Sequence, residues 1–372
     1  MPDNQAAWVT EDSSKPLYVA SAPYTQPGEN QLVIRARAVA INPVDWAKQI
    51  MGSGMLGYIK YPFVLGSDVA GEVVELGPGV TRFKVGDRVL GHAAGMDPRS
   101  AKAAESAFQE YVVLRTSVVS RIPDTISYAD ASVVPLGLST AATGLYQKGQ
   151  LGLEHPSVTP KSNGQILLIW GASTSVGSNA VQLAVASGYE VIATASPKNF
   201  EKVKKLGASH VFDYRSKTVI KDIASLLNSS GKESVGALAV GDGSLEACIS
   251  IIAATKNGRK FVAQASFTMG GAMPTTKWQF MMGVPFLMWS NVSTWFQCLI
   301  TGVKTKFIWG GDPIVDEIGP VVYHDFLEAA LANGTFIPAP EAQVVGKGLE
   351  NIQEAFAVAK KGVSAKKVVV EL

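Results

Sequence analysis

Residues 165–184 read QILLIWGASTSVGSNAVQLA, and this stretch decides the fold. The apolar run that ends at Trp170 predicts a buried strand, and the residues after Gly177 have the composition of a helix. Gly171 and Gly177 stand in the turn between the two. The first glycine permits a tight turn, and the last lets the helix pack closely on the strand. The stretch therefore has the form of a dinucleotide-binding loop.

Thr174 stands midway between these glycines, where such a loop would normally have a further glycine. A threonine reduces how closely the backbone can approach a pyrophosphate, but its hydroxyl can bond a phosphate oxygen. The N–H groups and dipole of the following helix favour the same anion. The alternative is a turn that binds no ligand, and the regular units that follow disfavour it. The residues expected to hold the cofactor here are Gly171, Ser173, Thr174, Ser175, Val176 and Gly177.

Working outward, short apolar strands alternate with helical segments from residue 164 onward, which predicts a parallel doubly wound sheet. The first third of the chain is instead rich in strand patterns, and no helix of length is expected before about residue 128. Residues 127–147 read as helical, with Ser127 as N-cap and Pro135 splitting the segment. The last segment reads as a helix and then a strand that return to the first domain. The predicted sections are 1–130, a β-rich domain; 131–318, the cofactor-binding domain; and 319–372, the return.

Composition limits the class of protein. The 372 residues are 47% hydrophobic and 17% charged with a net charge of +2, which fits a globular chain and does not imply nucleic-acid binding. Two cysteines form no disulfide framework, and the N-terminus lacks a signal-peptide profile, so we expect a cytoplasmic protein. The apolar stretch 279–303 is interrupted by Pro285 and by polar residues that include Asn291, Ser293, Thr294 and Gln297. We expect it to be buried or to face substrate, with membrane contact as the less favoured alternative.

The end of the next strand bears on the choice of cofactor. A protein that binds NAD usually places an acid there to hold the ribose 2′-hydroxyl. Residues 191–200 contain no acid, and Ser196 stands in that place, followed by Lys198 and Asn199. A small hydroxyl beside a cation suits a 2′-phosphate, which a carboxylate would repel. These residues therefore favour NADPH, although Lys198 alone could simply begin a solvated helix.

Five separated motifs carry a family resemblance: INPVDW (41–46), VLGSDVAGEVVELGPGV (64–80), FKVGDRVLG (83–91), the glycine loop, and FDYRS (212–216). In this order they resemble the medium-chain dehydrogenase/reductase superfamily. Within it the chain is similar to the zinc-free quinone oxidoreductases and to the enoyl reductases that act in trans with fungal polyketide synthases. The resemblance implies an α/β protein with a GroES-like β-rich catalytic domain and a Rossmann domain.

The resemblance also bears on zinc. Zinc-dependent members carry a cysteine near Pro43–Asp45 and a Gly-His-Glu where this chain has Gly66-Ser67-Asp68. The four clustered cysteines of the structural zinc lobe are also missing, so no metal is expected. His92, His155, His210 and His324 are interpreted as surface or structural histidines. Without a Lewis acid to stabilise an alkoxide, hydride addition to an activated C=C bond is the favoured chemistry.

By resemblance, four residues are candidates for the catalytic site, each with an alternative. Asn42 could donate to substrate or only cap a turn, and Tyr58 could donate a proton, with Tyr61 as competitor. Thr140 could hold the carboxamide or bond its own helix. Lys48 is offset by one from the family's lysine, so a solvated side chain is the alternative. Asp45 is expected to be structural.

Further residues resemble the family's cofactor contacts. Tyr214 and Arg215 match a Tyr-Arg pair near the adenosine phosphate, and Gly241 matches the position beside the nicotinamide ribose. Ser364 and Lys366 resemble a C-terminal Ser-Gly-Lys that reaches the cofactor, with alanine in place of the glycine.

The expected function is NADPH-dependent, zinc-independent reduction of the C=C bond of an α,β-unsaturated carbonyl. The substrate is expected to be an apolar small molecule or acyl chain, for which a polyketide synthase carrier domain is a candidate donor. A quinone oxidoreductase is the alternative, and an NADPH-binding isomerase, cyclase or interaction protein is the alternative of another class. Residues 267–310, rich in Phe, Trp and Met, could form a substrate wall, ordinary core or a homodimer interface, so both monomer and dimer remain open.

Overall fold

The computed structural model describes residues 2–12, 15–266, 274 and 276–372. The chain divides into two compact units. Unit 1 comprises 1–136, 275–277 and 311–372, and unit 2 comprises 137–274 and 278–310. The boundaries at 136/137 and 310/311 lie close to the sequence-based boundaries at 130/131 and 318/319, but they do not coincide with them.

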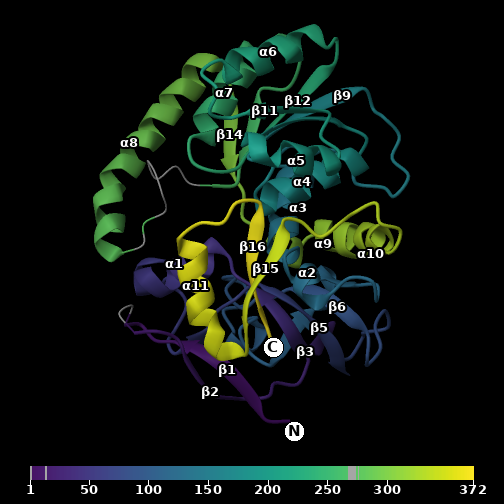
Figure 1. Ribbon diagram of the computed structural model, residues 1–372, viewed down its shortest axis with the longest axis vertical. Helices are drawn as coiled ribbons and strands as arrows, with labels where there is room; N and C mark the ends of the chain where they lie inside the picture. The colour runs from purple at the N-terminus through teal and green to yellow at the C-terminus, as the bar shows by residue number, and fades with distance from the viewer. Residues whose placement is uncertain (1, 13–14, 267–273, 275) are drawn as a thin grey trace. The chain divides into compact units, whose positions relative to one another are not determined.

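Unit 2 is built on a six-stranded sheet in the order β11-β10-β9-β12-β13-β14, and all neighbouring strands are parallel (Figure 1). This is the strand order of a dinucleotide-binding Rossmann domain, in which the direction of winding reverses between β9 and β12. The apolar runs noted in the sequence form these strands because a parallel sheet is covered on both faces. The strands are β9 (Gln165–Trp170), β10 (Glu190–Ala195), β11 (His210–Asp213), β12 (Glu233–Ala239), β13 (Phe261–Gln264) and β14 (Lys304–Phe307).

Helices connect these strands, and the side chains that face the sheet are buried aliphatic residues such as Ile223, Ile249 and Ile252. The helices assigned to this section are α3 (Pro135–Tyr146), α4 (Ser175–Ala186), α5 (Phe200–Lys205), α6 (Val219–Ser229), α7 (Ser244–Ala254) and α8 (Lys277–Thr301), with a short helix η4 (Pro197–Asn199).

Unit 1 is β-rich. Its larger sheet has the order β15-β16-β3-β5-β6-β8, with β7 paired to β3, and a smaller sheet has the order β2-β1-β4. The strands are β1 (Asn4–Val9), β2 (Tyr18–Ala22), β3 (Gln31–Ala40), β4 (Phe63–Val64), β5 (Asp68–Leu76), β6 (Arg88–His92), β7 (Tyr111–Arg115), β8 (Val119–Arg121), β15 (Glu341–Lys347) and β16 (Lys366–Glu371). The helical segments are α1 (Pro43–Met51), η1 (Gly52–Gly54), η2 (Ala103–Glu105), η3 (Thr116–Val118), α2 (Tyr128–Ser132), η5 (Asp312–Ile314), α9 (Ile318–Pro320), η6 (Val321–Leu327), α10 (Glu328–Ala332), η7 (Leu349–Asn351) and α11 (Ile352–Lys360).

The C-terminal strand returns to unit 1, as the sequence predicts. β16 pairs antiparallel with β3, where Val369 lies opposite Ala40, and parallel with β15. Residues from both ends of the chain, including Ile34 and Val370, share one hydrophobic core. The first and last segments of the sequence therefore form one structural unit.

Three sequence predictions can be compared directly with the helices. Pro135 splits the segment 127–147 into α2 and α3, and the Ser127 side chain accepts a hydrogen bond from the Asp130 N–H at 3.0 Å, so both expectations are confirmed. The expectation that no helix of length precedes residue 128 is wrong. Helix α1 spans nine residues, because Pro43 is well suited to the first turn of a helix and Asp45 bonds the backbone N–H of Asn42.

The environment of the apolar stretch 279–303 also differs from the one predicted. It lies almost wholly in α8, where Ser290 and Thr294 are the buried residues among those described. Most of its large apolar side chains are exposed, among them Trp289 at 72%. The expectation that this segment is buried is therefore wrong, whereas the alternative that it faces substrate stays a prediction. The part of the 267–310 prediction that falls on 267–273 and 275 lies outside the described residues.

No described helix combines the length and the apolarity that crossing a bilayer would require.

Candidate cofactor-binding site

The glycine loop joins β9 to α4 at the point where the sheet of unit 2 changes direction. Gly171 has a φ of +80°, and a Cβ there would lie 2.3 Å from the carbonyl oxygen of Val240, just beyond β12. A Cβ on Gly177 would lie 2.2 Å from the carbonyl oxygen of Gly171. The first glycine thus makes the turn and the second lets α4 approach β9. In open α/β sheets this switch point is where ligands bind.

Thr174 is the N-cap of α4. Its hydroxyl donates to the Gly171 carbonyl at 2.8 Å and accepts from the Gly177 N–H at 3.0 Å. The Thr174 hydroxyl proton is therefore already used inside the loop, and the expected bond from this hydroxyl to a phosphate oxygen is not supported. The threonine stabilises the turn that a third glycine would otherwise leave flexible.

The N-terminus of α4 is the part of the loop that can hold an anion. The first backbone bond of the helix runs from the Ser178 N–H to the Thr174 carbonyl at 2.8 Å. Ser175 and Val176 precede it in the first turn, where the helix dipole and the direction of the N–H groups favour an anion. Ser173 precedes the N-cap in the same turn and is partly exposed. These residues, together with the two glycines, form the candidate pyrophosphate cradle.

A second segment follows β10, the neighbour of β9. Ser196 is the N-cap residue of η4, and its hydroxyl accepts a hydrogen bond from the Asn199 amide at 3.1 Å. Ser196 and Asn199 are buried, whereas Lys198 is exposed. No carboxylate stands within Ser196–Asn199, so the place where an NAD-binding domain usually has an acid carries a hydroxyl and a neighbouring cation.

Two further predicted residues lie in unit 2 at the ends of neighbouring strands. Tyr214 follows β11 and is 45% exposed, with the guanidinium of Arg215 lying 5.6 Å from its ring centroid. Gly241 follows β12 with a φ of +104°, and nothing among the described residues lies within 4 Å of where its Cβ would be. The Gly241 N–H donates to the Ser266 hydroxyl at 3.0 Å. Gly241 thus has the backbone freedom and the open space that a passing ligand requires.

The remaining predicted residues of the cofactor set are Ser364 and Lys366, which lie in unit 1. Lys366 begins β16, points outward and is 3.9 Å from Glu341. Its neighbour Lys367 points inward and is 4% exposed. Because side chains alternate along a strand, one position decides which lysine is buried, and the sequence prediction selected the exposed one.

Lys367 belongs to a buried polar cluster in unit 1 that sequence reasoning did not assemble. Its ammonium forms an ion pair with Asp68 Oδ2 and donates to the Val133 carbonyl at 3.1 Å. The same carboxylate oxygen accepts from the Asn42 amide at 2.7 Å, and its other oxygen accepts from the Leu136 N–H at 2.5 Å. Asp68 is 0% exposed. The buried carboxylate is therefore neutralised and held by three partners, as a buried charge must be.

Two titratable groups adjoin this cluster. Asp45 is fully buried and accepts from the Asn42 N–H at 2.7 Å, and its other oxygen has no hydrogen-bond partner among the described residues. Burial raises the pKa of Asp45 to about 8. His92 pairs across the sheet with Asp68, and burial lowers its pKa to about 4 although Asp68 and Asp97 oppose this shift. At neutral pH, Asp45 therefore holds its proton and His92 is uncharged.

The expectation that His92 is structural or exposed agrees with its burial, and Asp45 has the structural contact that was expected of it. Asp68 was the residue from which this cluster could have been predicted. It is a carboxylate at the start of an apolar strand, and a buried carboxylate requires a cation beside it. The spacing of 299 residues to Lys367 left that partner unidentifiable from the sequence.

The structure places the four predicted catalytic residues in different surroundings. Asn42 is the N-cap residue of α1 and is oriented by Asp68, which fits a positioned amide. Thr140 lies on α3 and is nearly buried. Tyr58 is 39% exposed, and its hydroxyl donates to the Met96 carbonyl at 2.7 Å. Burial, followed by the charge of Asp97, raises the pKa of Tyr58 to about 12, so it is a poor acid.

Lys48 is the fourth, and the alternative of a solvated lysine is wrong. Its side chain is 0% exposed, and its ammonium donates to the carbonyls of Gly52, Met55 and Leu56 at 3.0, 2.7 and 3.3 Å. The nitrogen also lies 4.7 Å from the ring centroid of Tyr61. An ammonium has three protons, and all three are committed here, so Lys48 holds a turn together and has none left for a substrate.

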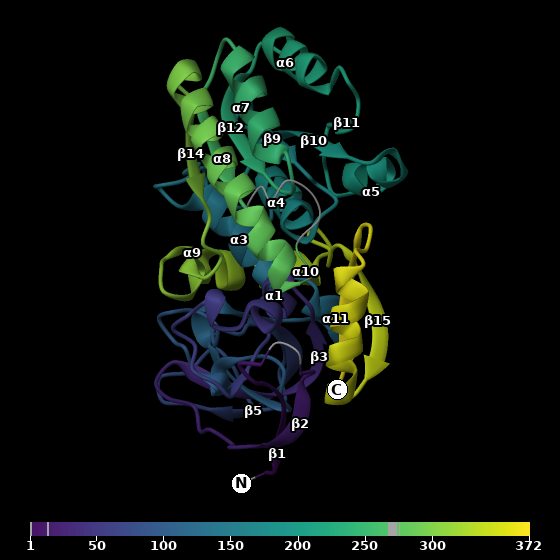
Figure 2. The same cartoon turned by 90° about the vertical axis from the view of Figure 1, so that its left-hand side faces the viewer.

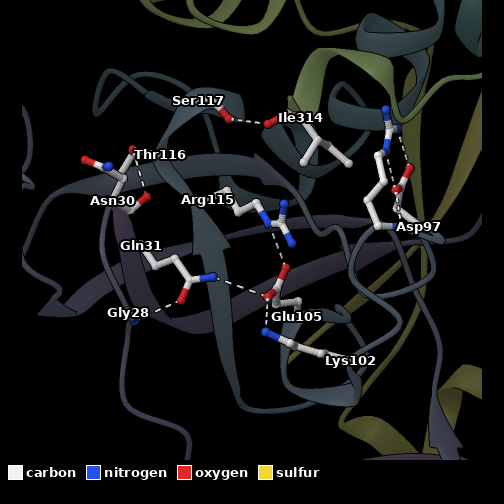
Figure 3. Close-up of polar contacts among 11 residues, drawn as sticks. Gly28, Asn30, Gln31, Asp97, Lys102, Glu105, Arg115, Thr116, Ser117 and Ile314 are labelled. Carbon is white, nitrogen blue, oxygen red and sulfur yellow. Dashed lines mark hydrogen bonds and ion pairs between the residues drawn. The ribbon is translucent and has the colours of Figure 1, made fainter. Parts of the chain in front are cut away.

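The structure also shows a cavity of about 260 Å³ in unit 1, lined by Glu29, Asn30, Gln31, Arg115, Thr116, Ser117 and Ile314. Figure 3 shows that two of its polar side chains are bonded to Glu105, which does not line the cavity: Arg115 pairs with Glu105 at 2.9 Å, and Gln31 donates to the same carboxylate at 3.2 Å. None of the predicted site residues lines it. Because Arg115 and Gln31 are already bonded to Glu105, we assign no binding role to this cavity.

The donor set for zinc can be tested directly. Among the residues that the structure describes, no three His, Cys, Asp or Glu side chains converge as a metal site. Cys248 is buried in α7 and Cys298 lies in α8, both in unit 2. In the buried cluster an ammonium, Lys367, already supplies the cation beside Asp68. The described residues therefore do not fit a catalytic zinc, and the absence of zinc stays a prediction that this donor set supports.

Comparison with known proteins defines the family. Residues 28–124 match the alcohol dehydrogenase GroES-like domain, and residues 175–276 match the family described as zinc-binding dehydrogenase. The chain is 50% identical over 373 residues to dehydrogenase pigH of Monascus ruber, with all of both chains covered. It is 39% identical over 371 residues to trans-enoyl reductase himH of Aspergillus japonicus, covering 99% of this chain and 97% of that protein.

Solved structures show the same fold. The quinone oxidoreductase from Coxiella burnetii matches with a TM-score of 0.68 at 20% identity over 100% of both chains. The CurK enoyl reductase matches with a TM-score of 0.68 at 20% identity over 99% of both chains. The chain belongs to the medium-chain dehydrogenase/reductase superfamily, with its GroES-like and Rossmann domains, and the predicted family and fold class are confirmed. It is an oxidoreductase that uses a nicotinamide cofactor.

Proposed function

We propose that this protein reduces the C=C bond of an α,β-unsaturated carbonyl with NADPH, without zinc. When bound, the cofactor supplies a hydride to the β-carbon, and negative charge then develops on the carbonyl oxygen. Hydrogen-bond donors suffice to stabilise such an oxyanion, whereas alcohol oxidation would need a stronger electrophile. The observation that carries the proposal is the donor set: the chain offers a cofactor loop and amide and hydroxyl donors, but no described cluster that fits a metal.

The proposal assigns roles to the chain's own residues. The Asn42 amide, which Asp68 orients, is proposed as a donor to the substrate carbonyl, and Thr140 as a second donor to substrate or carboxamide. Tyr58 has its pKa raised to about 12 and its proton committed to a backbone carbonyl. We therefore propose that water, rather than Tyr58, supplies the α-carbon proton.

The choice of NADPH over NADH rests on the segment after β10. Ser196 is uncharged, Lys198 lies two residues after it, and Arg215 follows β11, the strand that pairs with β10. A carboxylate at this point would repel that phosphate. We therefore expect NADPH to bind more tightly than NADH.

Relatives support an unsaturated carbonyl as the substrate class. Several are called trans-enoyl reductases, including tndF of Aspergillus flavipes at 33% identity over 371 residues. We propose an apolar acyl chain or enone as substrate for this chain, with delivery by a polyketide synthase carrier domain. Two unpaired cysteines suit a reducing compartment, and we propose the cytoplasm.

The test has a binding arm and a turnover arm. NADPH and NADH are titrated by fluorescence against the wild type, Ser196→Asp and the matched control Ser162→Asp, which adds the same charge at an exposed site before β9. Ser196→Asp should weaken NADPH binding at least about tenfold, or 1.4 kcal/mol, and leave NADH binding unchanged or tighter. Equal affinity of the wild type for both cofactors would contradict the NADPH assignment.

In the turnover arm, NADPH consumption is followed with an enone, an enoyl thioester, a quinone and a saturated ketone. Consumption with the two conjugated alkenes, and saturated products by mass spectrometry, is the expected result. Consumption with the quinone alone would support the quinone oxidoreductase instead. Tight NADPH binding with no consumption on any acceptor would favour a non-redox protein, and stoichiometric zinc in metal analysis would overturn the proposed chemistry.

A further inference from the structure

The ion pair of Asp68 and Lys367 lies at the break between α2 and α3. Helix α2 ends with Val133 as its C-cap residue, and α3 begins at Pro135. The Lys367 ammonium donates to the Val133 carbonyl at 3.1 Å. Asp68 Oδ1 accepts from the Leu136 N–H, in the first turn of α3, at 2.5 Å. The last carbonyls of a helix favour a cation and its first N–H groups an anion, so the ion pair caps both sides of the break.

Lys367 reaches this break from the face of β16 that is turned away from α11. Helix α11 lies beside β15 and β16 (Figures 1 and 2), and Val368 and Val370 share a core with Phe356 of that helix. Because side chains alternate along a strand, Lys367 points to the other face, where α2 contacts β16 and β5. Lys367 is 4% exposed and Asp68 is 0% exposed, so water does not screen the pair.

The same carboxylate also holds the Asn42 amide, whose nitrogen lies 2.7 Å from Asp68 Oδ2. An ionised carboxylate can only accept hydrogen bonds, so it fixes which end of the amide faces it. One of the two amide protons of Asn42 is used in this bond, and the other is held in the same plane. If residue 68 could also donate, the Asn42 side chain could turn and present its oxygen, which cannot donate to a substrate carbonyl. Asp68 therefore determines whether Asn42 acts as a donor.

Stability alone does not account for this arrangement. Taking two charges out of water is costly, and apolar side chains of similar volume are often as stable as a buried ion pair. What apolar side chains could not do is orient the Asn42 amide and bond both sides of the helix break. The first turn of α3 leads directly to Thr140, the second proposed donor, which follows Leu136 by four residues on the same helix.

We propose that Asp68 and Lys367 are positioning residues for the reaction. Lys367 holds the Asp68 carboxylate, and Asp68 in turn fixes the Asn42 amide and the first turn of α3. This inference rests on the proposed function, which makes Asn42 a donor to the substrate carbonyl. It goes beyond that function because it gives the ion pair a role that is exerted through Asn42 and through the backbone of α3.

The first experiment compares two buried ion pairs of unit 1. The double variant Asp68→Asn/Lys367→Met removes the positioning pair. The control, Glu105→Gln/Arg115→Met, removes a pair with a 2.9 Å contact and a carboxylate residue that is 2% exposed, away from the proposed donors. Circular dichroism and denaturant melts give the folded fraction of each variant, and kcat is expressed per folded chain.

The Asp68→Asn/Lys367→Met variant should lower kcat at least about tenfold, because a donor that is no longer positioned stabilises the oxyanion poorly. Its dissociation constant for NADPH should stay within about twofold of the wild type, since the cofactor loop lies in unit 2. The control variant should keep the wild-type kcat. An unchanged kcat in the first variant, or an equal loss in the control, would overturn the proposal.

A double-mutant cycle with Asn42→Ala tests whether the pair acts through the amide. In the Asn42→Ala background, the Asp68→Asn/Lys367→Met change should lower kcat by a clearly smaller factor than in the wild type, because the amide that it would release is already gone. Equal factors in the two backgrounds would show that the pair does not act through Asn42, which a merely structural role would produce.

Hydrogen exchange measured by mass spectrometry tests the helix break without any turnover. Peptides that cover residues 133–140 should show a protected Leu136 amide in the wild type, and its exchange should be at least about tenfold faster in the Asp68→Asn/Lys367→Met variant. Rapid exchange in the wild type would contradict the anchoring whether or not the variant folds. If that variant does not fold, Asp68→Leu/Lys367→Met, an apolar pair of similar volume, replaces it.

The two proposals can fail separately. A wild type that reduces a quinone but no conjugated alkene would contradict the proposed function, and the same cycle on the quinone would still test the pair, because Asn42 would then donate to a quinone oxygen. A wild type that reduces the enone while both backgrounds respond equally would leave the proposed function in place and refute the positioning role.

Discussion

Replacing Gly177 with alanine tests the geometry of the cofactor loop most directly. The new Cβ would lie 2.2 Å from the Gly171 carbonyl oxygen and 2.7 Å from the Ala172 Cα, whereas ordinary contact begins at 3.4 Å. Both neighbours are backbone atoms, so the strain cannot be relieved by rotating a side chain. The turn must open by about 1 Å, and overpacking of this kind costs about 1–3 kcal/mol of folding free energy.

The same displacement moves the N–H groups at the start of α4 away from the position where they would meet a pyrophosphate. We therefore expect the dissociation constant of NADPH to rise about ten- to a hundredfold, or about 1.4–2.7 kcal/mol. Chemical denaturation and fluorescence titration measure the two effects separately. Gly54→Ala is the matched control, since nothing lies within 4 Å of its Cβ and its φ is not in the left-handed region.

Gly54→Ala should leave NADPH binding unchanged and stability unchanged or slightly higher. If Gly177→Ala binds NADPH as tightly as the wild type while remaining folded, the loop is not the pyrophosphate site. If its stability is also unchanged, the close packing of α4 on β9 does not constrain this position, and the reasoning from the glycines fails.

Three further predictions follow from contacts in the two units. Thr174→Ala removes the N-cap of α4 and should lower the free energy of unfolding by about 1 kcal/mol, whereas Thr174→Ser should retain it; denaturant melts decide. Lys367→Met leaves the Asp68 carboxylate buried without its cation and should cost about 3–5 kcal/mol, and Lys367→Met/Asp68→Asn should recover part of this loss. Asp45 keeps its proton in the folded state up to about pH 8 but loses it near pH 4 when unfolded, so its contribution to stability falls as pH rises between those values. His92 has the opposite effect between about pH 4 and 6.5, because its pKa is lower in the folded than in the unfolded chain and stability therefore rises with pH in that range. The free energy of unfolding should therefore fall between pH 6.5 and 8, and this fall should disappear in Asp45→Asn. A wild type equally stable at pH 6.5 and 8 would contradict the Asp45 assignment.

The parts of the fold that follow local rules were predictable from the sequence. Short apolar runs that alternate with helical segments predicted the parallel sheet, because the strands of such a sheet are covered on both faces and are therefore almost wholly apolar. Gly171 and Gly177 indicated the loop because a side chain at either position would clash with nearby backbone atoms. Helix α1 was missed because its nine residues adjoin a strand-rich region and Pro43 reads equally well as part of a turn.

The surroundings of individual side chains were harder to predict from the sequence. Lys48 and Lys367 are buried cations whose partners are backbone carbonyls or a carboxylate distant in sequence, and no local pattern separates them from solvated lysines. The double role of the Thr174 hydroxyl depends on the loop geometry itself. The outward-facing apolar residues of α8 depart from the tendency of apolar residues to lie inside, so their exposure could not be predicted from their composition.

The return of the last strand to unit 1 has a consequence for synthesis of the chain. β16 ends at Glu371 and covers the edge of β3, which was complete by Ala40. At about 5–20 residues per second, that edge waits on the order of half a minute on the ribosome while all of unit 2 is made. Unit 2 is one nearly continuous stretch and can fold as it emerges, whereas the sheet of unit 1 can close only once β16 has emerged. Any arrest or truncation before β16 would therefore leave a nascent chain with a finished Rossmann unit and an open, association-prone strand edge.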